Sequence, residues 1–301
     1  FAYEGKKIDS PRQVIAQRTD LLPNAGIVPS LLAQQGNAVS KFKEDLFLLK
    51  VDAQIAKNQR VEATARVRRE TDMIPEDMKL SVAENVLNRS NDEDRLDFKH
   101  EWSSDDFLNE ARIGYEKYSW NPHSNANKPY IKYQVSPSNT DINVVDVLVV
   151  GGSPNNQFRE QSGLLFQDDL TYTGKSGHTM KAGFKVKHIT YDLSGTAFAV
   201  ERRIERIDTV TGQTNLIRSE PVVPPYGVEF SNNQYGIYFQ DDWQASEKLL
   251  LNLGMRYDYE DNMLNDSYAT PADRVALFGK QDPRDGAPVG QTYAQSLAKG
   301  G

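Results

Sequence analysis

The sequence predicts an all-β protein, an antiparallel transmembrane β-barrel, from three observations. Apolar and polar residues alternate with a period of two over long segments, which is typical of strands that have one apolar face. Short polar turns and long polar connections follow one another along the chain, as in barrels of the outer-membrane type. No run approaches the ~20 apolar residues that a membrane-spanning helix needs, so a bundle of such helices is excluded.

The composition is compatible with this fold. Hydrophobic residues make up 38% of the 301 residues and charged residues 26%, as expected when polar side chains face a wet lumen. Lys and Arg total 35 against 42 for Asp and Glu, a net charge of -7, which argues against a general nucleic-acid binder. The absence of cysteine excludes disulfides, thiolate metal sites and cysteine nucleophiles.

The first hairpin has the clearest alternation. Apolar residues occupy every second position from Phe47 to Ile55, and again from Val61 to Val67. Residues 57–59 supply a tight polar turn between the two segments. A helix would need apolar residues at spacings of three and four, which this segment lacks. The pattern therefore predicts two long strands.

Three further hairpins follow the same plan, and about eight or nine strands are expected in all. Their expected strands are 96–102 with 111–115, 164–172 with 180–186, and 235–243 with 249–259. Their expected turns are 103–106, 174–177 and 245–247.

The connections between the hairpins are long and polar, and we expect them to be extracellular loops. They cover about residues 5–43, 71–92, 121–156, 194–231 and 262–301. Several structureless loops of this length are unusual in an ordinary domain. One of them is expected to contain a short helix, because Leu80, Ala83 and Leu87 would share one helical face.

The two faces of the predicted strands differ in chemistry. The polar face supplies the residues expected to line the lumen: Asp52, Glu62, Arg66, Arg68, Arg112, Lys185, Gln240 and Arg256. Aromatic residues near strand ends are expected to lie at the membrane interfaces: Trp102, Phe107, Trp243, Tyr257 and Tyr259. The same alternation would also arise in a one-sided soluble sheet with aromatic residues at its margins.

The last hairpin carries a pair of motifs. Residues 234–243 read QYGIYFQDDW, and residues 251–258 read LNLGMRYD. This pair resembles a barrel hairpin of TonB-dependent outer-membrane transporters, in which an aromatic-Gln-Asp-Asp/Glu-Trp strand precedes a Leu-Asn-x-Gly-x-Arg-Tyr-Asp strand. Residues 178–186 are similar to the strand that often comes before it, and residues 49–52 with Arg66 resemble an early hairpin of the Oar-like branch.

This resemblance implies a 22-stranded barrel with a plugged lumen. Neither an energy-coupling box nor a plug is found before Gly5, and the last residues lack a terminal aromatic strand. We therefore expect the chain to be part of one barrel domain, without its plug and closing strands. Independent closure as an eight-stranded barrel remains the geometric alternative.

The function implied by the resemblance is uptake of a scarce ligand across the bacterial outer membrane, with no catalytic residue and no cofactor. The implied partners are outer-membrane lipid, an inner-membrane TonB energy-coupling complex that acts through the plug, and an unidentified small ligand, peptide or oligosaccharide. Two alternatives stay open: a non-transporting outer-membrane adhesin or structural anchor, and a soluble β-rich binding module.

The sequence offers little enzymatic chemistry. Its four histidines show no tight metal-ligand spacing, and Gly174-Lys175-Ser176 lacks the earlier glycine of a phosphate-binding loop. Adjacent carboxylates occur at 105–106, 168–169 and 241–242. Neighbours on a strand point to opposite faces, which is the wrong geometry for a shared acid–base site. We therefore interpret these carboxylates as solvated turn residues.

Two acidic segments, at 91–94 and 258–261, could supply oxygen ligands for Ca²⁺, but they match no defined loop spacing. Solubility is therefore the preferred interpretation of these segments. No metal site is predicted.

Overall fold

The computed structural model describes residues 1–174, 177–196, 200–222, 226–262, 269–270, 272–280, 290–292, 294–295 and 298. The chain divides into two units, Phe1–Asp261 and Asn262–Gly301. Among the described residues of the second unit, Ala272–Phe278 form a short helix, α2. Within the described residues, every helix is too short or too polar to cross a membrane.

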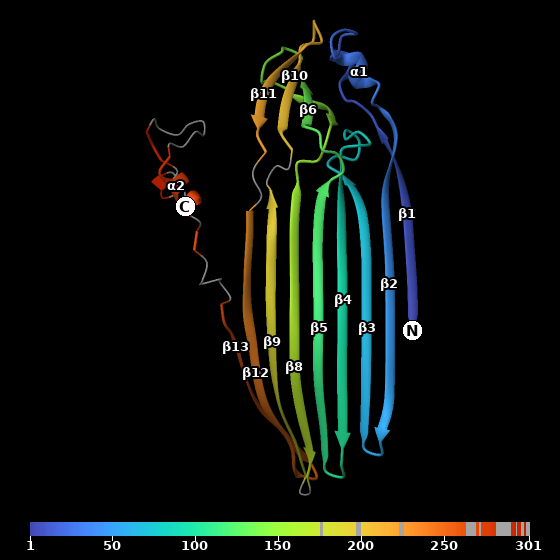
Figure 1. Cartoon of the computed structure of the whole chain (residues 1–301), viewed down its shortest axis with the longest axis vertical. Coiled ribbons are helices and arrows are strands. Elements are labelled where there is room, and N and C mark those ends of the chain that lie inside the picture. Colours follow the sequence, from blue (N-terminus) through green and yellow to red (C-terminus); the bar gives the residue numbers. More distant parts are fainter. Residues whose placement is uncertain are drawn as a thin grey trace. The chain divides into compact units, whose positions relative to one another are not determined.

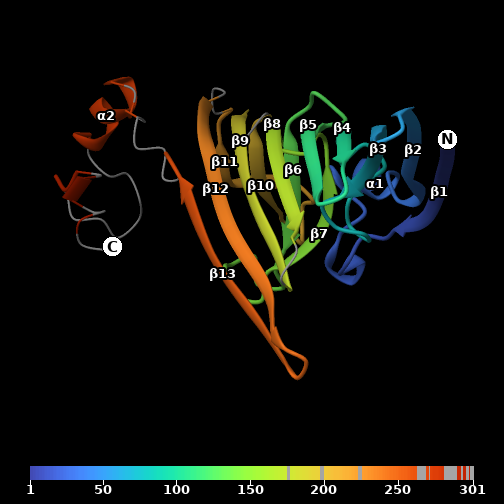
Figure 2. The same ribbon diagram turned by 90° about the horizontal axis from the view of Figure 1, so that it is seen from below.

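The first unit is built on a nine-stranded antiparallel sheet, which we call the wall (Figure 1). Four of the eight connections between its neighbouring strands are short turns, and the sheet is curved when seen from below (Figure 2). In spatial order, its strands are β1 (Ala2–Val14), β2 (Gly36–Ala56), β3 (Gln59–Pro75), β4 (Val86–Ser103), β5 (Phe107–Ser124), β8 (Asn156–Thr173), β9 (His178–Thr196), β12 (Tyr226–Ser246) and β13 (Leu249–Glu260).

The four predicted short turns are confirmed. They join β2 to β3, β4 to β5, β8 to β9, and β12 to β13, all at the same end of the wall (Figure 1). Two residues of the third turn, Lys175 and Ser176, lie outside the described residues. The expected eight or nine strands correspond to the nine strands of the wall.

The register separates the residues of the wall into two faces. Val51, Ala63, Phe98, Ile113 and Phe166 are successive partners across five strands, and we call their side the apolar face. The next residues along the same strands are also successive partners, and we call their side the ionic face. These partners are Asp52, Glu62, Lys99, Arg112 and Gln167. The predicted segregation of side chains is therefore present across strands as well as along them.

A second, four-stranded sheet lies beyond the ends of the wall strands that face away from the short turns (Figure 1). Together with α1 (Val28–Leu32), the 3-10 helix Thr19–Leu21 and residues 76–85, we call it the cap. Its strands, in spatial order, are β11 (Thr214–Glu220), β10 (Arg202–Ile207), β6 (Tyr130–Val135) and β7 (Val145–Val150).

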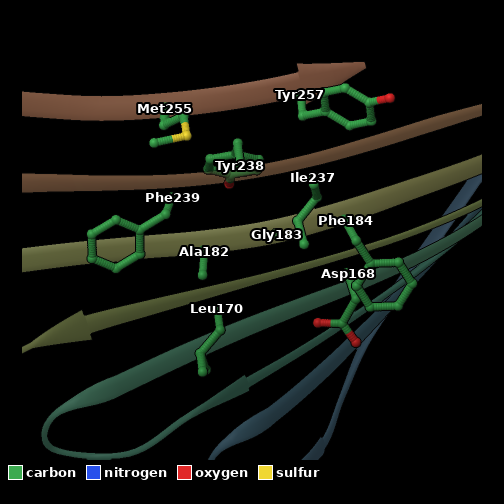
Figure 3. Close-up of a pocket in the computed structure, with 10 residues that line it drawn as sticks. All are labelled: Asp168, Leu170, Ala182, Gly183, Phe184, Ile237, Tyr238, Phe239, Met255 and Tyr257. Carbon is green, nitrogen blue, oxygen red and sulfur yellow. The ribbon is translucent and has the colours of Figure 1, made fainter. Parts of the chain in front are cut away.

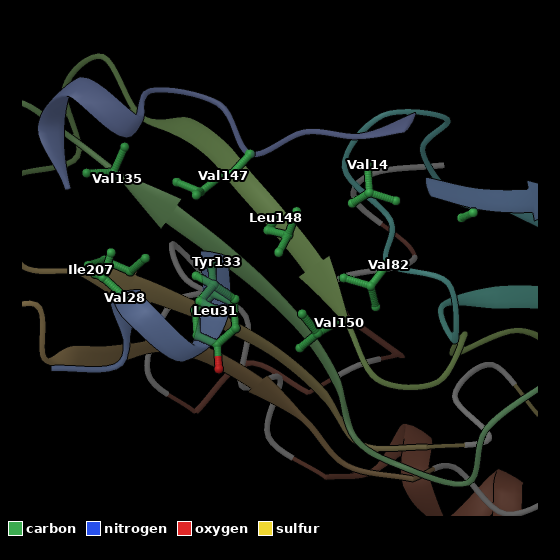
Figure 4. Close-up of a cluster of buried hydrophobic side chains, with 12 residues drawn as sticks. Val14, Val28, Leu31, Val82, Tyr133, Val135, Val147, Leu148, Val150 and Ile207 are labelled. Carbon is green, nitrogen blue, oxygen red and sulfur yellow. The ribbon is translucent and has the colours of Figure 1, made fainter. Parts of the chain in front are cut away.

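The cap has a hydrophobic core of its own. Leu31 from α1, Tyr133 from β6 and Leu148 from β7 pack together with Ile207 from β10, and each is at least 95% buried (Figure 4). Val14 and Ala38, from the first two wall strands, belong to the same cluster. The core therefore joins the cap to the wall.

Polar contacts also hold the cap against the wall. The Arg12 guanidinium is buried and donates hydrogen bonds to the backbone carbonyls of Ser81 and Val82, at 3.1 Å in the second case. The register partner of Arg12 is Ala38, which lies on the same face of β2 as Asp52. The cap therefore packs against the ionic side of the wall.

Much of the sequence expected to be loop is instead strand. Residues 5–14 and 36–43 lie in β1 and β2, and the other loop ranges before residue 232 also contain wall and cap strands. The reason is visible at Asp94 and Lys117, register partners in phase with the apolar face. Towards the cap, both faces of the wall strands carry polar residues. The strands continue to pair there, but the alternation of apolar and polar residues that would predict them has ended.

The short helix expected around Leu80 and Leu87 is wrong. The carboxylate of Asp77 accepts hydrogen bonds from the backbone N–H groups of residues 79 and 80, at 2.7 and 2.8 Å, which form a turn. The backbone N–H of Val82 then donates to the carbonyl of Val149 in β7, at 3.0 Å. The apolar residues of this segment therefore enter the cap core one at a time and form no helical face.

Candidate functional site

The eight residues predicted to line a lumen all lie on the ionic face. Asp52, Glu62, Arg112 and Lys185 occupy a single row across the wall strands. The other four lie on the same face in neighbouring rows: Arg66, Arg68, Gln240 and Arg256. The structure thus brings the predicted residues to one side of the wall, spread over its height and width.

Ion pairs connect these residues to neighbours that the sequence did not identify. Both the Nε and an Nη of Arg112 donate to Asp97, with a distance of 2.9 Å from Nε. Lys50 lies 2.9 Å from the carboxylate of Glu62. Because these pairs bridge adjacent strands, each cation of this part of the wall has a carboxylate on the next strand.

A buried acidic group surrounds Arg68 near the cap. The guanidinium donates to Glu44 at 2.7 Å and also to Glu70, which is 6% exposed. Arg66, one row closer to the short turns, pairs with Glu93 at 3.4 Å. Paired charges on this face compensate one another, so the wall offers a mixed surface and no single sign of charge.

The other end of the wall has a different arrangement. Arg256 and Asp258 form a two-point ion pair within β13, with donor–acceptor distances of 2.6 and 2.7 Å. Gln240 donates to Asp242 at 3.1 Å. The Arg256 and Asp258 side chains lie over Gly236, where a Cβ would be 2.9 Å from the Asp258 carboxylate. Both side chains are more than half exposed, so this part of the ionic face is more open than the part around Arg68.

A tyrosine fills one gap that a glycine leaves on this face. Gly183 and Tyr238 are register partners, and a Cβ at Gly183 would lie 2.5 Å from the ring of Tyr238. The ring can cross the β9 backbone only because residue 183 has no side chain. Its hydroxyl then donates to Asp169 on β8 at 2.8 Å. Three strands are thus joined by one side chain.

The predicted interfacial aromatic residues lie on the apolar face in two groups. Trp102, Phe107 and Trp243 are close to the short turns, where Phe107 contacts Tyr172 with ring centroids 4.8 Å apart. Tyr257 and Tyr259 lie farther from the turns on β13, and both are more than half exposed.

Sequence analysis missed several polar side chains on the apolar face. Asp168 and Asp241 lie on the apolar face within β8 and β12, and their neighbours Asp169 and Asp242 lie on the ionic face. The strands expected at 164–172 and 235–243 include all four residues, so the interpretation of these pairs as solvated turn residues is wrong. Adjacent residues do face opposite sides as expected. The signal that could have located Asp168 was its phase, which matches that of the apolar residues two positions before and after it.

Several polar side chains on the apolar face pair with one another. Asn109 donates to Asp168 at 2.5 Å, and the Nδ1 of His178 lies 2.8 Å from Asp241. The Nε2 of His100 lies 3.2 Å from the side-chain oxygen of Gln59 on the adjacent strand. None of these contacts crosses to the ionic face.

The acidic segments considered for Ca²⁺ lie in or at the ends of strands. Residues 91–94 belong to β4, and residues 258–260 belong to β13. Among the described residues, no group of three or more His, Asp and Glu side chains is arranged to hold a metal ion.

The cap contains two tyrosines with perturbed acidity. The Tyr130 ring is fully buried, and its hydroxyl donates to Glu76 at 2.7 Å. Burial, followed by this hydrogen bond, raises the pKa of Tyr130 above its ordinary value. Burial also raises the pKa of Tyr133 to about 12. Both phenols are therefore weaker acids than an exposed tyrosine, and we interpret them as structural groups of the cap.

Comparisons with known proteins agree with this architecture. A family model described as "Outer membrane beta barrel domain" matches residues 3–276. The outer membrane transporter YddB from Escherichia coli is similar in structure, with a TM-score of 0.56 and 14% identity over 86% of this chain and 31% of that one.

The siderophore receptor PiuA from Acinetobacter baumannii also matches, with a TM-score of 0.46 and 12% identity over 86% of this chain and 40% of that one. This chain therefore spans less than half the length of the solved structures that it resembles. No curated protein matches the sequence significantly.

The match covers most of the chain, and the nine-stranded wall has the same antiparallel architecture as the transporter barrel. The chain therefore belongs to the outer membrane beta barrel domain family of the bacterial outer membrane, and its fold is similar to part of the barrel of an outer membrane transporter.

Proposed function

We propose that this chain forms part of the wall of a TonB-dependent receptor that imports a scarce ligand. The observation that carries the proposal is the pairing of a lipid-compatible apolar face with an ionic face in one family-matched sheet. In such a barrel the ionic face lines the lumen, where charged side chains remain hydrated or paired. The chain contributes no catalytic group to this process.

The role of the wall is to scaffold and line the transport path. Its ion pairs, such as Arg112 with Asp97, fix side chains against the sheet and leave the lumen without a strong electrostatic preference. A ligand of either charge could therefore pass along this part of the wall. Selection of the ligand is assigned to the cap and to the plug that the family resemblance implies.

The aromatic groups mark the proposed membrane interfaces. Trp102, Phe107 and Trp243 would lie at the periplasmic interface, and Tyr257 and Tyr259 would lie in the outer part of the apolar band. Aromatic side chains favour this region because their rings are amphipathic. The short turns then face the periplasm and the cap faces the medium.

Sidedness can be tested with single cysteines, because this chain contains no native cysteine. Val210→Cys reports on the exposed β10–β11 connection of the cap, and Asn58→Cys reports on the β2–β3 turn. A membrane-impermeant maleimide should label the first variant in intact cells, and the second only after the outer membrane is opened. The reverse pattern would overturn the assigned orientation.

Transport by energy coupling is separated from a structural anchor by binding of the full-length protein to the purified periplasmic domain of TonB. The full-length protein is reconstituted in lipid and immobilised, and the TonB domain is passed over it. If the protein is an importer, it should retain the TonB domain, and the retained fraction should increase when ligand-containing culture medium is added. An adhesin or anchor should retain none, which would contradict the import proposal while leaving the barrel assignment intact.

A further inference from the structure

The cap joins connections that leave the wall at distant strands. α1 belongs to the connection between β1 and β2, and β10 and β11 lie between β9 and β12 in sequence. In the wall, β3, β4, β5 and β8 separate β2 from β9, which is about 24 Å measured along the sheet. Figure 2 shows α1 and β7 on the concave side of the curved wall. The cap therefore crosses the concave side from one part of the wall to another.

At the tip of the β10–β11 hairpin, two glycines bring these distant connections into backbone contact. Gly26 and Gly212 have φ angles of 61° and 67°. A Cβ at Gly212 would lie 2.2 Å from the carbonyl oxygen of Ala25, and a Cβ at Gly26 would lie 2.2 Å from the carbonyl oxygen of Gly212. The backbone N–H of Ile27 donates to that second carbonyl at 3.1 Å. Only glycine permits this approach at both positions.

The hairpin tip and the core below it form a stiff unit. The carboxylate of Asp208 accepts hydrogen bonds from the backbone N–H groups of Val210 and Thr211, at 2.9 and 2.7 Å, which order the turn. Ile207 of β10 is fully buried in the same core as Leu31 of α1 (Figure 4). A close-packed core deforms little and transmits strain, so the cap resists a change in the distance that it spans.

Both ends of the cap are attached to the wall. At the β1–β2 end, Val14 and Ala38 of the wall belong to the cap core itself. At the other end, residues 197–201 are the whole connection from β9 to β10, and residues 221–225 are the whole connection from β11 to β12. The first of these connections is also held by β6, because the backbone N–H of Tyr130 donates to the carbonyl of Glu201 at 2.8 Å.

The convex side of the wall has no comparable brace among the described residues. Phe98, Leu164 and Ile237 are exposed there, and neither buried cluster includes a residue of the apolar face. Figure 3 shows its side chains standing apart, with a groove of about 580 Å³ where Ala182 lies beside Phe239. Contacts on this side therefore do not fix the curvature of the sheet.

We propose that the cap is a strut that fixes the curvature of the wall at its outer end, and with it the width of the lumen beneath the cap. A sheet alone leaves its shape adjustable, because the twist between neighbouring strands varies from roughly −10° to −35°. The number of strands sets the size of a barrel, and the strut sets the shape of this arc of it. The inference rests on the proposed function only in treating the concave side as a transport lumen.

The test measures distances across the wall of the full-length protein in vesicles by pulsed electron paramagnetic resonance, with no other cysteine present. Nitroxide labels on Lys41→Cys in β2 and Ser194→Cys in β9 report on the cap end of the wall. Labels on Ala53→Cys and Phe184→Cys, in the same two strands, report on the part nearer the short turns. All four positions are in phase with the apolar face, so the labels point away from the cap.

Two substitutions release the strut from within the cap. Gly212→Ala brings a Cβ against the carbonyl of residue 25, and Ile207→Asp places a carboxylate in the cap core. Each should broaden the distance distribution of the cap-end pair about twofold, because the strands regain their range of twist, and should leave the other pair unchanged. Gly36→Ala is the matched control. Its φ of 135° is also unfavourable for alanine, but no atom lies within 4 Å of the new Cβ, so neither pair should change.

Crosslinking verifies that the contact has been released. A short bifunctional maleimide should join Ala25→Cys to Gln213→Cys in the parent protein and should fail to join them in the two strut variants. An unchanged cap-end distribution in a variant that no longer crosslinks would overturn the proposal, and so would equal broadening of both pairs. A narrow parent distribution that broadens only at the cap end would support the strut even in a protein that imports nothing.

Discussion

The wall and the cap bury their apolar residues in opposite ways. In the wall, Ile113 and Leu164 are at least half exposed although they lie at the centre of long strands. In the cap, Tyr130 and Leu148 have no exposed surface. The cap is thus organised like a water-soluble domain, whereas the wall lacks a protein partner for its apolar face. We infer that lipid completes the wall and that the cap forms its core without lipid.

The largest expected effect sharpens this contrast with one substitution in each region. Leu148→Ala removes a fully buried side chain from the cap core and should destabilise the cap by ~2–5 kcal/mol, because a cavity remains. Leu164→Ala removes a side chain that is 57% exposed and should cost much less. A fluorophore on Val210→Cys would report cap unfolding in urea. Equal costs would contradict the difference between the two regions.

The second prediction concerns the two faces of one wall strand. Phe166→Arg places a cation on the apolar face and should cost ~2–4 kcal/mol near the bilayer midplane. Gln167→Arg makes the same change on the ionic face, where Asp169 is available, and should cost less than half as much. Unfolding of both variants from lipid vesicles measures the two costs. A larger penalty at Gln167 would exchange the assignment of the faces.

The third prediction separates the regions by pH. Because the pKa of Tyr133 is raised to about 12 from an ordinary value of 10, the neutral phenol stabilises the folded cap. That contribution is complete below pH 10 and is lost as the pH rises towards 12, by up to about 2–3 kcal/mol. Tyr133→Phe should remove this part of the alkaline destabilisation. An unchanged alkaline profile in the variant would show that Tyr133 is hydrated.

The smallest effect is expected where the two regions meet. Arg12→Met keeps the length of the side chain but removes the donors to the carbonyls of Ser81 and Val82. Leaving buried carbonyls without partners should cost about 1–3 kcal/mol. The loss should appear in cap unfolding and in protease sensitivity at residues 76–85. The electrophoretic mobility of the refolded protein on an unheated gel, which reports on the folded barrel, should not change. A changed mobility would show that Arg12 also stabilises the wall.

The hairpins of the wall could be predicted from the sequence because each strand has one apolar and one polar face. The cap could not be predicted in this way. Its strand β7 is the segment VDVLVV, in which four consecutive residues are buried, so no alternation marks it. Tertiary packing also decided residues 76–85, where the spacing suggested a helix but Asp77 forms a turn.

The lumen-facing candidates were found by parity, but their ion-pair partners were not. On the ionic face, Lys187 of β9 pairs with Glu116 of β5, and the two residues come together only because β5 pairs with β8, a strand that lies after a cap segment in sequence. No local pattern specifies that pairing. Asp168 and Asp241 were not placed on the apolar face because pairs of adjacent carboxylates were interpreted as solvated turn residues, although the strands predicted at 164–172 and 235–243 include them.

The central claim is that the apolar face of the wall meets lipid and the ionic face meets water. Nitroxide labels at single cysteines along residues 164–170 of β8, in the full-length protein in vesicles, test it most directly. We predict a period of two, with labels at 164, 166, 168 and 170 accessible to oxygen in the membrane and labels at 165, 167 and 169 accessible to a water-soluble nickel complex. Uniform accessibility to the nickel complex at all seven positions would contradict the claim.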